Sequence, residues 1–320
     1  MTMSAEGPPR GTSYAPSGGS AAANAASVGV HTPFTCVLDA RASLGECPIW
    51  SSREQVLYWV DINAPTLHRF DPATGLDAAM PMPESIGCFA LRRAGGFVVA
   101  LRSGIWTAAP NGTLERKIVA APYDPARHRF NDGRCDPHGR LFAGSMNEPR
   151  DAASGALYRL NDDGTLTEVI GGVTISNGLA WSPDGRTMYH ADTPAHTVRA
   201  YDYDLATGTP SNPRMFAHWL GETDRPDGAA VDSAGNYWSA FYRGGKLVQI
   251  SSHGDIVGEY PIPAMCPTMC AFGGADLKTL YLTTARQMRE PDELVRLPQS
   301  GGVFAMRVDV PGLPEPLCTV

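Results

Sequence analysis

The chain repeats one pattern six times: a short turn, usually rich in Gly or Asp, precedes an apolar segment with the composition of a β-strand. Reference positions within these turns lie 42, 43, 46, 50 and 41 residues apart. A period of roughly 40 to 50 residues with two hairpins in each unit is typical of a β-propeller blade. The reference positions are Glu54, Gly96, Gly139, Gly185, Gly235 and Asp276.

A second group of turn signals, rich in Asn, Asp and Gly, follows later in each unit, and these residues tolerate the positive φ of tight hairpins. The 34 Gly and 27 Pro residues leave little room for long helices. We therefore predict an all-β fold, a six-bladed β-propeller. A β-sandwich is the alternative. The apolar runs span 56–60, 97–101, 141–146, 187–191, 236–241 and 279–283, and the second turns span 71–75, 110–113, 161–165, 205–209, 252–255 and 310–312.

The propeller is expected to span residues 34–320, after a low-complexity tail at 1–33. Because this tail is mostly Gly, Ala, Ser and Pro, it cannot bury enough apolar surface to offset its ordering entropy, and we expect it to be flexible. It has neither a basic start nor an apolar core, which argues against a secretory signal and favours a cytoplasmic location. We expect a strand around 36–39 to pair with the last repeat and close the ring.

The composition excludes several classes of partner. A net charge of −7 without any basic run argues against a nucleic-acid surface, and no apolar stretch approaches the length of a membrane span. Nothing in the sequence indicates an oligomeric state. The seven cysteines are scattered and odd in number, so buried free thiols are expected rather than disulfides. A structural zinc at Cys266 and Cys270 is the less favoured alternative, since no second pair accompanies them.

Oxygen-bearing residues occupy four of the six positions that lie eight residues before the reference positions. They are Glu46, Asn131, Asn177 and Asp227, and Cys88 and Thr268 complete the set. If the repeats close into a ring, the side chains at these equivalent positions all face the central axis. We expect each residue to lie just before the innermost strand of its blade, at one mouth of the channel. A nearby Gly would let the backbone turn inward after three of the four.

Two carboxylates and one or two amide oxygens suit a hard divalent cation, and a site with few protein ligands keeps positions open for catalysis. The alternative is that these Asn and Asp residues only cap turns, but four residues in register, one of them a Glu, argue against it. A rival zinc site is less favoured because its candidate histidines do not recur at equivalent positions: His128, His138 and His190. Four tryptophans are expected to pack between strands, although one could form the floor of a sugar pocket: Trp59, Trp106, Trp181 and Trp238.

Several motifs, taken together and in this order, resemble the family of gluconolactonases, regucalcin and luciferin-regenerating enzymes. They are LGECPIW (44–50), RFNDGRCDPHGRLFAGSM (129–146), SNGLAWSPDGRTMYHADT (176–193), RPDGAAVDSAGNYW (225–238) and FGGADLKTLYLTTA (272–285). The last of these, with GGVFAM (301–306), looks most like bacterial sugar-acid lactonases. The resemblance implies a six-bladed propeller with one divalent metal.

The resemblance also assigns roles to residues. It implies that Glu46, Asn177 and Asp227 hold the metal, and that Arg129 and Asn131 contact a sugar lactone. Family members often carry a substrate-contacting Glu after this kind of strand; here Glu148 either fills that role, shifted by one position, or is solvated. Oxygen ligands favour Ca²⁺, Mg²⁺ or Mn²⁺, while Zn²⁺ and Fe²⁺ also accept such sites.

The expected activity is hydrolysis of an aldonolactone, such as glucono-, galactono-, arabinono- or xylonolactone, to the aldonic acid. The metal would polarise the lactone carbonyl, and Asp227 would orient and deprotonate the attacking water. No nucleophile elbow, zinc-protease helix or phosphate loop occurs in the sequence. Two alternatives stay open. One is a calcium-binding regulatory propeller of the regucalcin type without turnover. The other is a protein-binding scaffold, which would not need oxygen-bearing residues at equivalent positions of the repeats.

Overall fold

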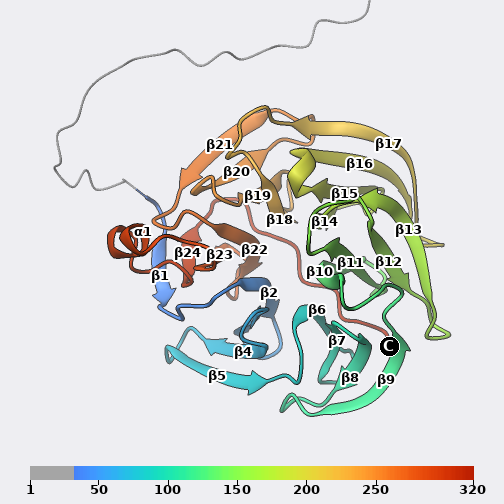
Figure 1. The fold of residues 1–320 in the computed structure, drawn as a ribbon. Coiled ribbons are helices and arrows are strands. Elements are labelled where there is room, and N and C mark those ends of the chain that lie inside the picture. The colour runs from blue at the N-terminus through green and yellow to red at the C-terminus, as the bar shows by residue number, and fades with distance from the viewer. Residues whose placement is uncertain (1–31) are drawn as a thin grey trace, which may run out of the picture.

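The structure, a computed structural model, describes residues 32–320. Six antiparallel sheets of four strands are arranged as blades around a central channel, which confirms the predicted β-propeller (Figure 1). Most of the predicted tail (residues 1–31) lies outside the described residues, and the predicted boundary between 33 and 34 stays a prediction. No helix among the described residues is long and apolar enough to cross a membrane.

The strands follow one another from the innermost to the outermost position of each blade. Blade 1 contains β2 (Gly45–Ser51), β3 (Val56–Asp61), β4 (Thr66–Asp71) and β5 (Leu76–Pro81), and blade 2 contains β6 (Ile86–Leu91), β7 (Phe97–Leu101), β8 (Gly104–Ala108) and β9 (Leu114–Ala120). Blade 3 contains β10 (His128–Cys135), β11 (Leu141–Asn147), β12 (Gly155–Leu160) and β13 (Leu166–Val173). Blade 4 contains β14 (Ser176–Trp181), β15 (Thr187–Asp192), β16 (Thr197–Asp204) and β17 (Thr209–His218), and blade 5 contains β18 (Pro226–Val231), β19 (Tyr237–Phe241), β20 (Lys246–Ile250) and β21 (Ile256–Pro261).

Blade 6 joins the two ends of the described chain. It contains β22 (Pro267–Gly273), β23 (Thr279–Thr284), β24 (Val303–Arg307) and, as its outermost strand, β1 (Thr35–Leu38). Strand β1 pairs antiparallel with β24, with Thr35 opposite Ala305, which confirms the predicted closure. A short helix, α1 (Pro291–Arg296), and the 3₁₀ turn Thr193–Ala195 are the helical elements of the described chain.

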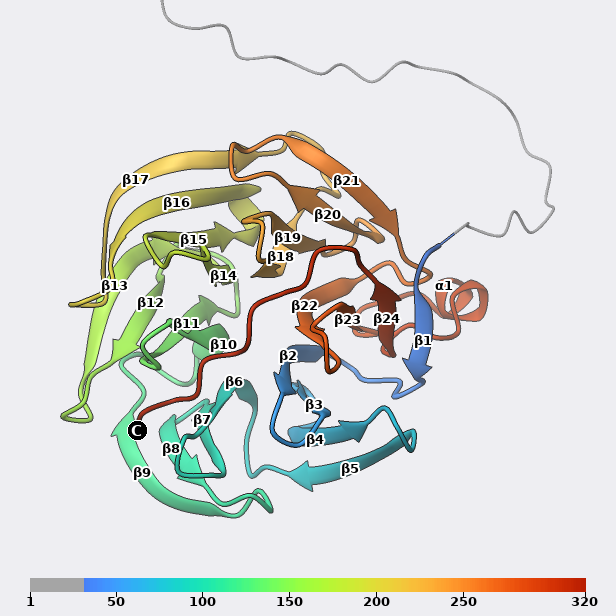
Figure 2. The same ribbon diagram turned by 180° about the vertical axis from the view of Figure 1, so that it is seen from behind.

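One predicted hairpin is wrong. The turn signal at 310–312 predicts a hairpin, and its five counterparts do form hairpins, between the third and fourth strands of the other blades. In the structure β1 already occupies the outermost position, so the chain after β24 has no neighbouring strand with which to form a hairpin. It runs instead as an extended C-terminal segment (308–320) across one mouth of the channel (Figure 2).

The predicted apolar runs are strands, and each of them is the second strand of its blade. The innermost strands precede the Gly- and Asp-rich turns and contain the candidate residues: Glu46 is the second residue of β2, and Asp227 is the second residue of β18. The expectation that these residues lie before the innermost strand is therefore corrected. Each innermost strand pairs with the second strand on both sides of the candidate residue, and its register shifts at that residue, as described below.

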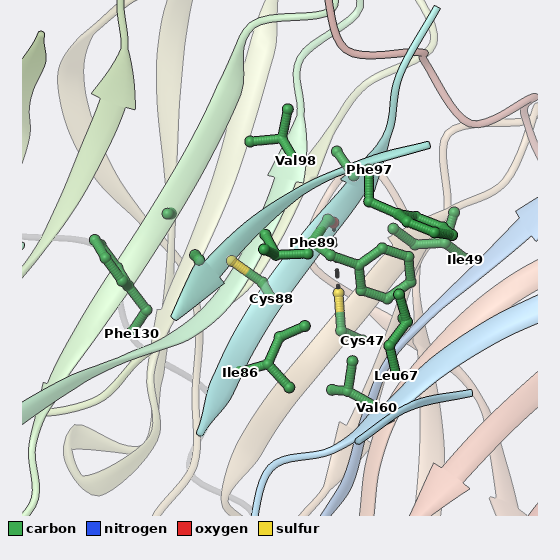
Figure 3. Close-up of a cluster of buried hydrophobic side chains, with 14 of the residues drawn as sticks. Cys47, Ile49, Val60, Leu67, Ile86, Cys88, Phe89, Phe97, Val98 and Phe130 are labelled. Atoms are coloured by element: carbon green, nitrogen blue, oxygen red, sulfur yellow. Dashed lines mark hydrogen bonds between the residues drawn. The ribbon is translucent and has the colours of Figure 1, made fainter. Parts of the chain in front are cut away.

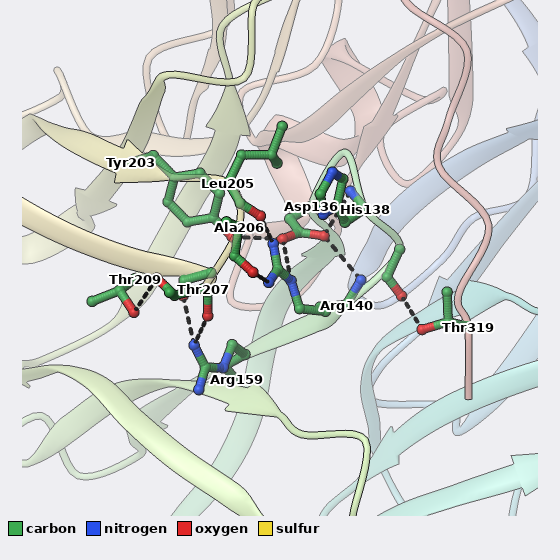
Figure 4. Close-up of polar contacts among 12 residues, drawn as sticks. Asp136, His138, Arg140, Arg159, Tyr203, Leu205, Ala206, Thr207, Thr209 and Thr319 are labelled. Carbon is green, nitrogen blue, oxygen red and sulfur yellow. Dashed lines mark hydrogen bonds and ion pairs between the residues drawn. The ribbon is translucent and has the colours of Figure 1, made fainter.

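Buried polar side chains fix the turns at the ends of the innermost strands. Asp136 is fully buried; its Oδ1 accepts hydrogen bonds from the backbone N–H groups of His138 and Arg140, both at 2.9 Å. Its Oδ2 accepts from Arg140 Nε at 2.7 Å and from the Tyr203 hydroxyl at 2.6 Å (Figure 4). Since Tyr203 belongs to β16, these bonds tie blade 3 to blade 4. His138 takes part only through its backbone N–H, and its side chain is exposed and does not line the candidate cavity.

The core lies between neighbouring blades. Side chains from the first three blades form a continuous cluster that includes Phe89, Phe97 and Phe130, all with at most 2% of their surface exposed (Figure 3). The Cys47 thiol donates to the backbone oxygen of Phe89 at 3.8 Å, so a buried thiol bridges blades 1 and 2. All seven cysteines are free, as predicted.

Candidate functional site

Five of the six predicted site residues line one cavity at a mouth of the channel. The cavity has a volume of about 180 Å³. Its lining includes Glu46, Arg129, Asn131, Asn177 and Asp227, which come from the innermost strands of blades 1, 3, 4 and 5. The sixth, Glu148, is not among the lining residues. The four predicted tryptophans do not line it either, so none of them is a sugar-binding floor.

A β-bulge or irregularity of register occurs at the candidate position of every innermost strand. The interruptions fall between Glu46 and Ile49, between Phe130 and Gly133, between Asn177 and Ala180 and between Pro226 and Ala229, with counterparts in β6 and β22. A bulge leaves one residue unpaired and re-aims its side chain. The equivalent positions therefore reach the channel because the same local distortion recurs in all six blades.

The glycines that follow the candidate residues have two different roles. Gly178 has a φ of +60°, which supports the predicted sharp turn after Asn177. Gly133 and Gly228 do not have a positive φ, so the predicted turn is wrong for them. A Cβ on Gly228 would lie 2.4 Å from Cβ of Met269, and a Cβ on Gly133 would lie 2.4 Å from Sγ of Cys88. These two glycines allow the innermost strands of adjacent blades to approach closely.

A chain of hydrogen bonds orients the amide side chains of the cavity. Arg129 Nη1 donates to Asn131 Oδ1 at 2.8 Å, and Asn131 Nδ2 donates to Asn177 Oδ1 at 2.7 Å. Asn177 Nδ2 donates to the hydroxyl of Thr193 at 2.7 Å, and this hydroxyl donates to the backbone oxygen of Pro226, also at 2.7 Å. Because the only proton of the hydroxyl is used in that last bond, Thr193 must accept from Asn177. This fixes the amide orientation of Asn177.

The two carboxylates of the cavity are buried close to one another. Glu46 is 6% exposed and Asp227 is 5% exposed. Burial and the neighbouring Asp132 raise the pKa of Glu46 to about 8. Burial and the negative charge of Glu46 raise the pKa of Asp227 well above its usual range. Desolvation and mutual repulsion thus both disfavour two negative charges here.

The donor set of the cavity fits a divalent cation. Two buried carboxylates line one cavity, and neither forms an ion pair among the described residues: Arg129 pairs with Glu148, at 3.5 Å, rather than with Glu46 or Asp227. A cation would offset the repulsion that raises the pKa of both groups. No group of three or more His, Cys, Asp or Glu side chains that could hold a metal occurs within residues 32–320. The candidate set has two such residues, and its third oxygen is the amide of Asn177.

Arg129 and Glu148 form part of an ion-pair network beside the cavity. Arg129 is 7% exposed, and burial lowers the pKa of its guanidinium. Glu148 accepts from both terminal nitrogens of Arg102, at 2.6 and 2.9 Å, and this contact lowers the pKa of Glu148. Glu148 therefore supports Arg129 from outside the cavity. Its predicted contact with substrate stays a prediction.

Several residues of the cavity were not predicted from the sequence. Thr193, His196 and Tyr242 come from the loops between the second and third strands of blades 4 and 5, where the residue types differ from one blade to the next. Asp132 does not line the cavity, but it is buried, 3% exposed, and, together with burial, its charge raises the pKa of Glu46; its Oδ2 accepts from the Leu179 N–H at 3.1 Å, and its Oδ1 has no partner among the described residues. In the sequence, Asp132 could have been recognised as a candidate because it directly follows Asn131 and precedes a Gly.

Comparisons with known proteins agree on one family. The family model described as the SMP-30/Gluconolactonase/LRE-like region matches residues 44–286. A 6-deoxy-6-sulfogluconolactonase from Pseudomonas putida is 49% identical over 88% of this chain and 97% of its own length. A pentonolactonase from Haloferax volcanii is 38% identical over 88% of this chain and 96% of its own length. The crystal structure of a calcium-binding protein, regucalcin, from Agrobacterium tumefaciens has a TM-score of 0.85 at 26% identity and covers 89% of this chain and 97% of that one.

Proposed function

Because the chain belongs to the SMP-30/gluconolactonase/LRE-like family, we propose that it hydrolyses a sugar lactone to the corresponding aldonic acid with the help of one divalent cation. The observation that carries the proposal is the convergence of Glu46, Asn177, Asp227, Arg129 and Asn131 on a single cavity. The relatives named 6-deoxy-6-sulfogluconolactonase and pentonolactonase support a lactone as the substrate class.

The cation would be held by Glu46, Asn177 and Asp227. When bound, it supplies a Lewis acid that stabilises negative charge on the carbonyl oxygen of the lactone. The hydrogen bonds described above leave Asn177 Oδ1 directed toward the cavity, where Asn131 reaches it. Oxygen ligands of this kind favour Ca²⁺, Mg²⁺ or Mn²⁺, and Zn²⁺ and Fe²⁺ stay candidates.

The side chains of the chain perform the remaining steps. Arg129 and Asn131 hold the lactone, with Arg129 fixed from behind by Glu148. Asp227 orients a water molecule and takes its proton as the water oxygen attacks the carbonyl carbon. The ring C–O bond then breaks, and the ring oxygen receives a proton and becomes a hydroxyl. The net change is the addition of one water.

A second candidate function is cation binding without turnover. It is favoured by the printed description of the Agrobacterium neighbour as a calcium-binding protein and by regucalcins among the relatives, including a human one at 36% identity. The donor set alone does not separate the two, because both functions need Glu46 and Asp227. The arginine and amide side chains that converge on the same cavity favour the lactonase, since a simple cation site has no use for them.

Proton release from gluconolactone and from pentonolactones would test the proposal. We expect turnover above the spontaneous rate, its loss on chelation, and its loss in Asp227→Asn, a change that keeps the shape of the side chain. Asp255→Asn removes one carboxylate from an exposed turn and serves as the matched control. A cation that binds without any acceleration of lactone opening would support the regucalcin-type function instead.

A further inference from the structure

Three basic side chains line the cavity from loops rather than from the innermost strands. Arg150 follows β11, His196 follows the 3₁₀ turn before β16, and Arg225 precedes β18. With Arg129, they place four basic side chains around a cavity that holds two carboxylates, Glu46 and Asp227. The whole chain has a net charge of −7, so this concentration of basic groups departs from its overall composition.

The acidic residues beside Arg150 are paired with other arginines. Glu148 receives two hydrogen bonds from Arg102, and Asp151 receives two from Arg127 at 2.6 and 2.8 Å. No side-chain ion pair or hydrogen bond of Arg150 occurs within residues 32–320. Arg150 is an exposed residue of the cavity lining, and the donors of its guanidinium have no protein partner among the described residues.

Arg225 is left unpaired in a similar way. The adjacent Asp224 lies 3.5 Å from Lys246 Nζ, and Arg225 itself uses only Nε, which donates to the backbone oxygen of Glu222 at 3.0 Å. Neither terminal nitrogen of Arg225 has a partner in the described part of the chain. The following Pro226 restricts the backbone of Arg225, and so limits where its side chain can reach.

The backbone at Arg150 and at His196 has an unusual conformation. Arg150 has a φ of +59° and His196 a φ of +56°, in the left-handed region that residues other than Gly rarely adopt. Nδ1 of His196 is buried and has no hydrogen-bond partner among the described residues.

We propose that Arg150 and Arg225, assisted by His196, bind an anionic substituent of the lactone, remote from its carbonyl, and so select acidic sugar lactones. This inference rests on the proposed function and assigns its substrate class. A neutral aldonolactone offers these arginines only hydroxyl and carbonyl acceptors, whereas an anionic substituent forms stronger, charge-assisted hydrogen bonds with them. Sulfonate, phosphate and carboxylate share the acceptor oxygens that arginine binds in charge-assisted pairs.

The test compares gluconolactone with gluconolactones that carry a sulfonate or a phosphate on the exocyclic carbon. We expect the wild type to have a higher kcat/KM for at least one charged lactone, mainly through a lower KM. In Arg150→Gln and Arg225→Gln, the ratio of charged to neutral kcat/KM should fall by about 10-fold or more, as for loss of a hydrogen bond to a charged group. The fall should shrink as salt is added.

Arg199→Gln is the matched control, because Arg199 is exposed on β16, has no ion pair among the described residues and does not line the cavity. It changes the net charge equally and should leave the ratio as it is in the wild type. Equal losses for charged and neutral lactones in the Arg150 and Arg225 variants would overturn the proposal, since the arginines would then act on the lactone ring or the carbonyl.

A binding measurement separates this inference from the proposed function. Calorimetry with gluconate and with its sulfonated and phosphorylated forms needs no turnover. Tighter binding of the sulfonated or phosphorylated form than of gluconate, lost in the two arginine variants, supports the inference even if no lactone is hydrolysed, in which case the proposed function fails. Hydrolysis of neutral lactone without any preference for charge in rate or binding refutes the inference and leaves the proposed function standing.

Discussion

The side chain of Asn131 on β10 donates a hydrogen bond to Oδ1 of Asn177 on β14 at 2.7 Å, across the boundary between blades 3 and 4. The bond joins a residue proposed to hold the lactone to a residue proposed to hold the cation. Both amides are oriented by the same chain of donors and acceptors, from Arg129 to the backbone oxygen of Pro226. Substrate binding and cation binding are therefore expected to respond together to changes in this chain.

Thr193→Val should weaken cation binding although Thr193 is not a proposed ligand. The change keeps the shape of the side chain and removes the hydroxyl that accepts from Asn177 and donates to Pro226. Two buried polar groups lose their partner, which costs about 1–3 kcal/mol each, and Asn177 becomes free to turn its NH₂ group toward the cavity. Calorimetric titration with Ca²⁺ or Mn²⁺ and urea unfolding measure the two effects. Thr193→Ser keeps the hydroxyl; if it behaves as Thr193→Val does, the orienting role is refuted.

Removal of the divalent cation should destabilise the protein more at alkaline than at acidic pH. In the cation-free protein the pKa of Glu46 is raised from 4.5 to about 8, so the folded state binds more protons than the unfolded state between these values. The free energy of unfolding then falls as pH rises from about 4.5 to about 8. A bound cation offsets this loss. The difference in Tm between cation-supplied and chelated protein should grow from pH 5 to pH 8.

Glu46→Gln is the control for this pH dependence. The neutral side chain removes the titration, so the chelated variant should show a flatter Tm profile than the chelated wild type over the same range. Its Tm should also gain little from added cation, because one ligand charge is missing. A wild-type Tm that chelator leaves unchanged at every pH would contradict the assignment of these residues as a cation site.

The C-terminal segment should stabilise the propeller through one buried ion pair. Glu315 lies 3.4 Å from Nε of Arg134, and the two side chains are 14% and 9% exposed. Glu315→Gln leaves a buried guanidinium without its counter-charge, which should cost about 3–5 kcal/mol in urea unfolding. Glu290→Gln, at an exposed position, is the control and should cost little.

A double variant separates the pair from the contacts of the segment as a whole. Arg134→Met combined with Glu315→Leu replaces both charges by apolar groups and should recover most of the lost stability. If the single Glu315 variant is as stable as the Glu290 control, the ion pair does not anchor the segment.

His190 should make the protein sensitive to acid. It is buried and contacts the Ser176 hydroxyl at 2.8 Å, and burial lowers the pKa of His190 from 6.5 to about 4. The unfolded state therefore binds more protons between these values, and stability falls as pH drops from about 6.5 to about 4, by at most about 3 kcal/mol. His190→Gln should flatten the Tm profile in this range, whereas His253→Gln, at an exposed turn, should not. Identical profiles for the two variants would refute the assignment.

The sequence was sufficient to predict the ring and the four cavity-lining residues Glu46, Asn131, Asn177 and Asp227, because both follow the repeat. Glu46, Asn177 and Asp227 recur at one offset, and the structure explains why the offset is constant: every innermost strand bulges at that position. The resemblance to the gluconolactonase and regucalcin family is confirmed by the family match. Bulges themselves leave no simple signal, which is why the site residues were expected before the innermost strands rather than within them.

Features that do not repeat were not predictable. Tyr242, Gln287 and Arg225 reach the cavity from loops that recur in each blade, but the residue types in these loops differ from one blade to the next. The turn signal at 310–312 was read as a hairpin because Pro and Gly indicate a turn but not the strand that follows it. The roles of Gly133 and Gly228 were also misassigned, since a sequence does not distinguish a glycine needed for its φ from one needed for close packing.

Stepwise addition of a divalent cation to chelated protein, with lactone hydrolysis followed by proton release, tests the central claim most directly. If Glu46, Asn177 and Asp227 hold one catalytic cation, hydrolysis should rise with added cation and saturate at one equivalent per chain, and Asp227→Asn should show no rise. Full hydrolysis by the chelated wild type, or an unchanged response in Asp227→Asn, would contradict the account.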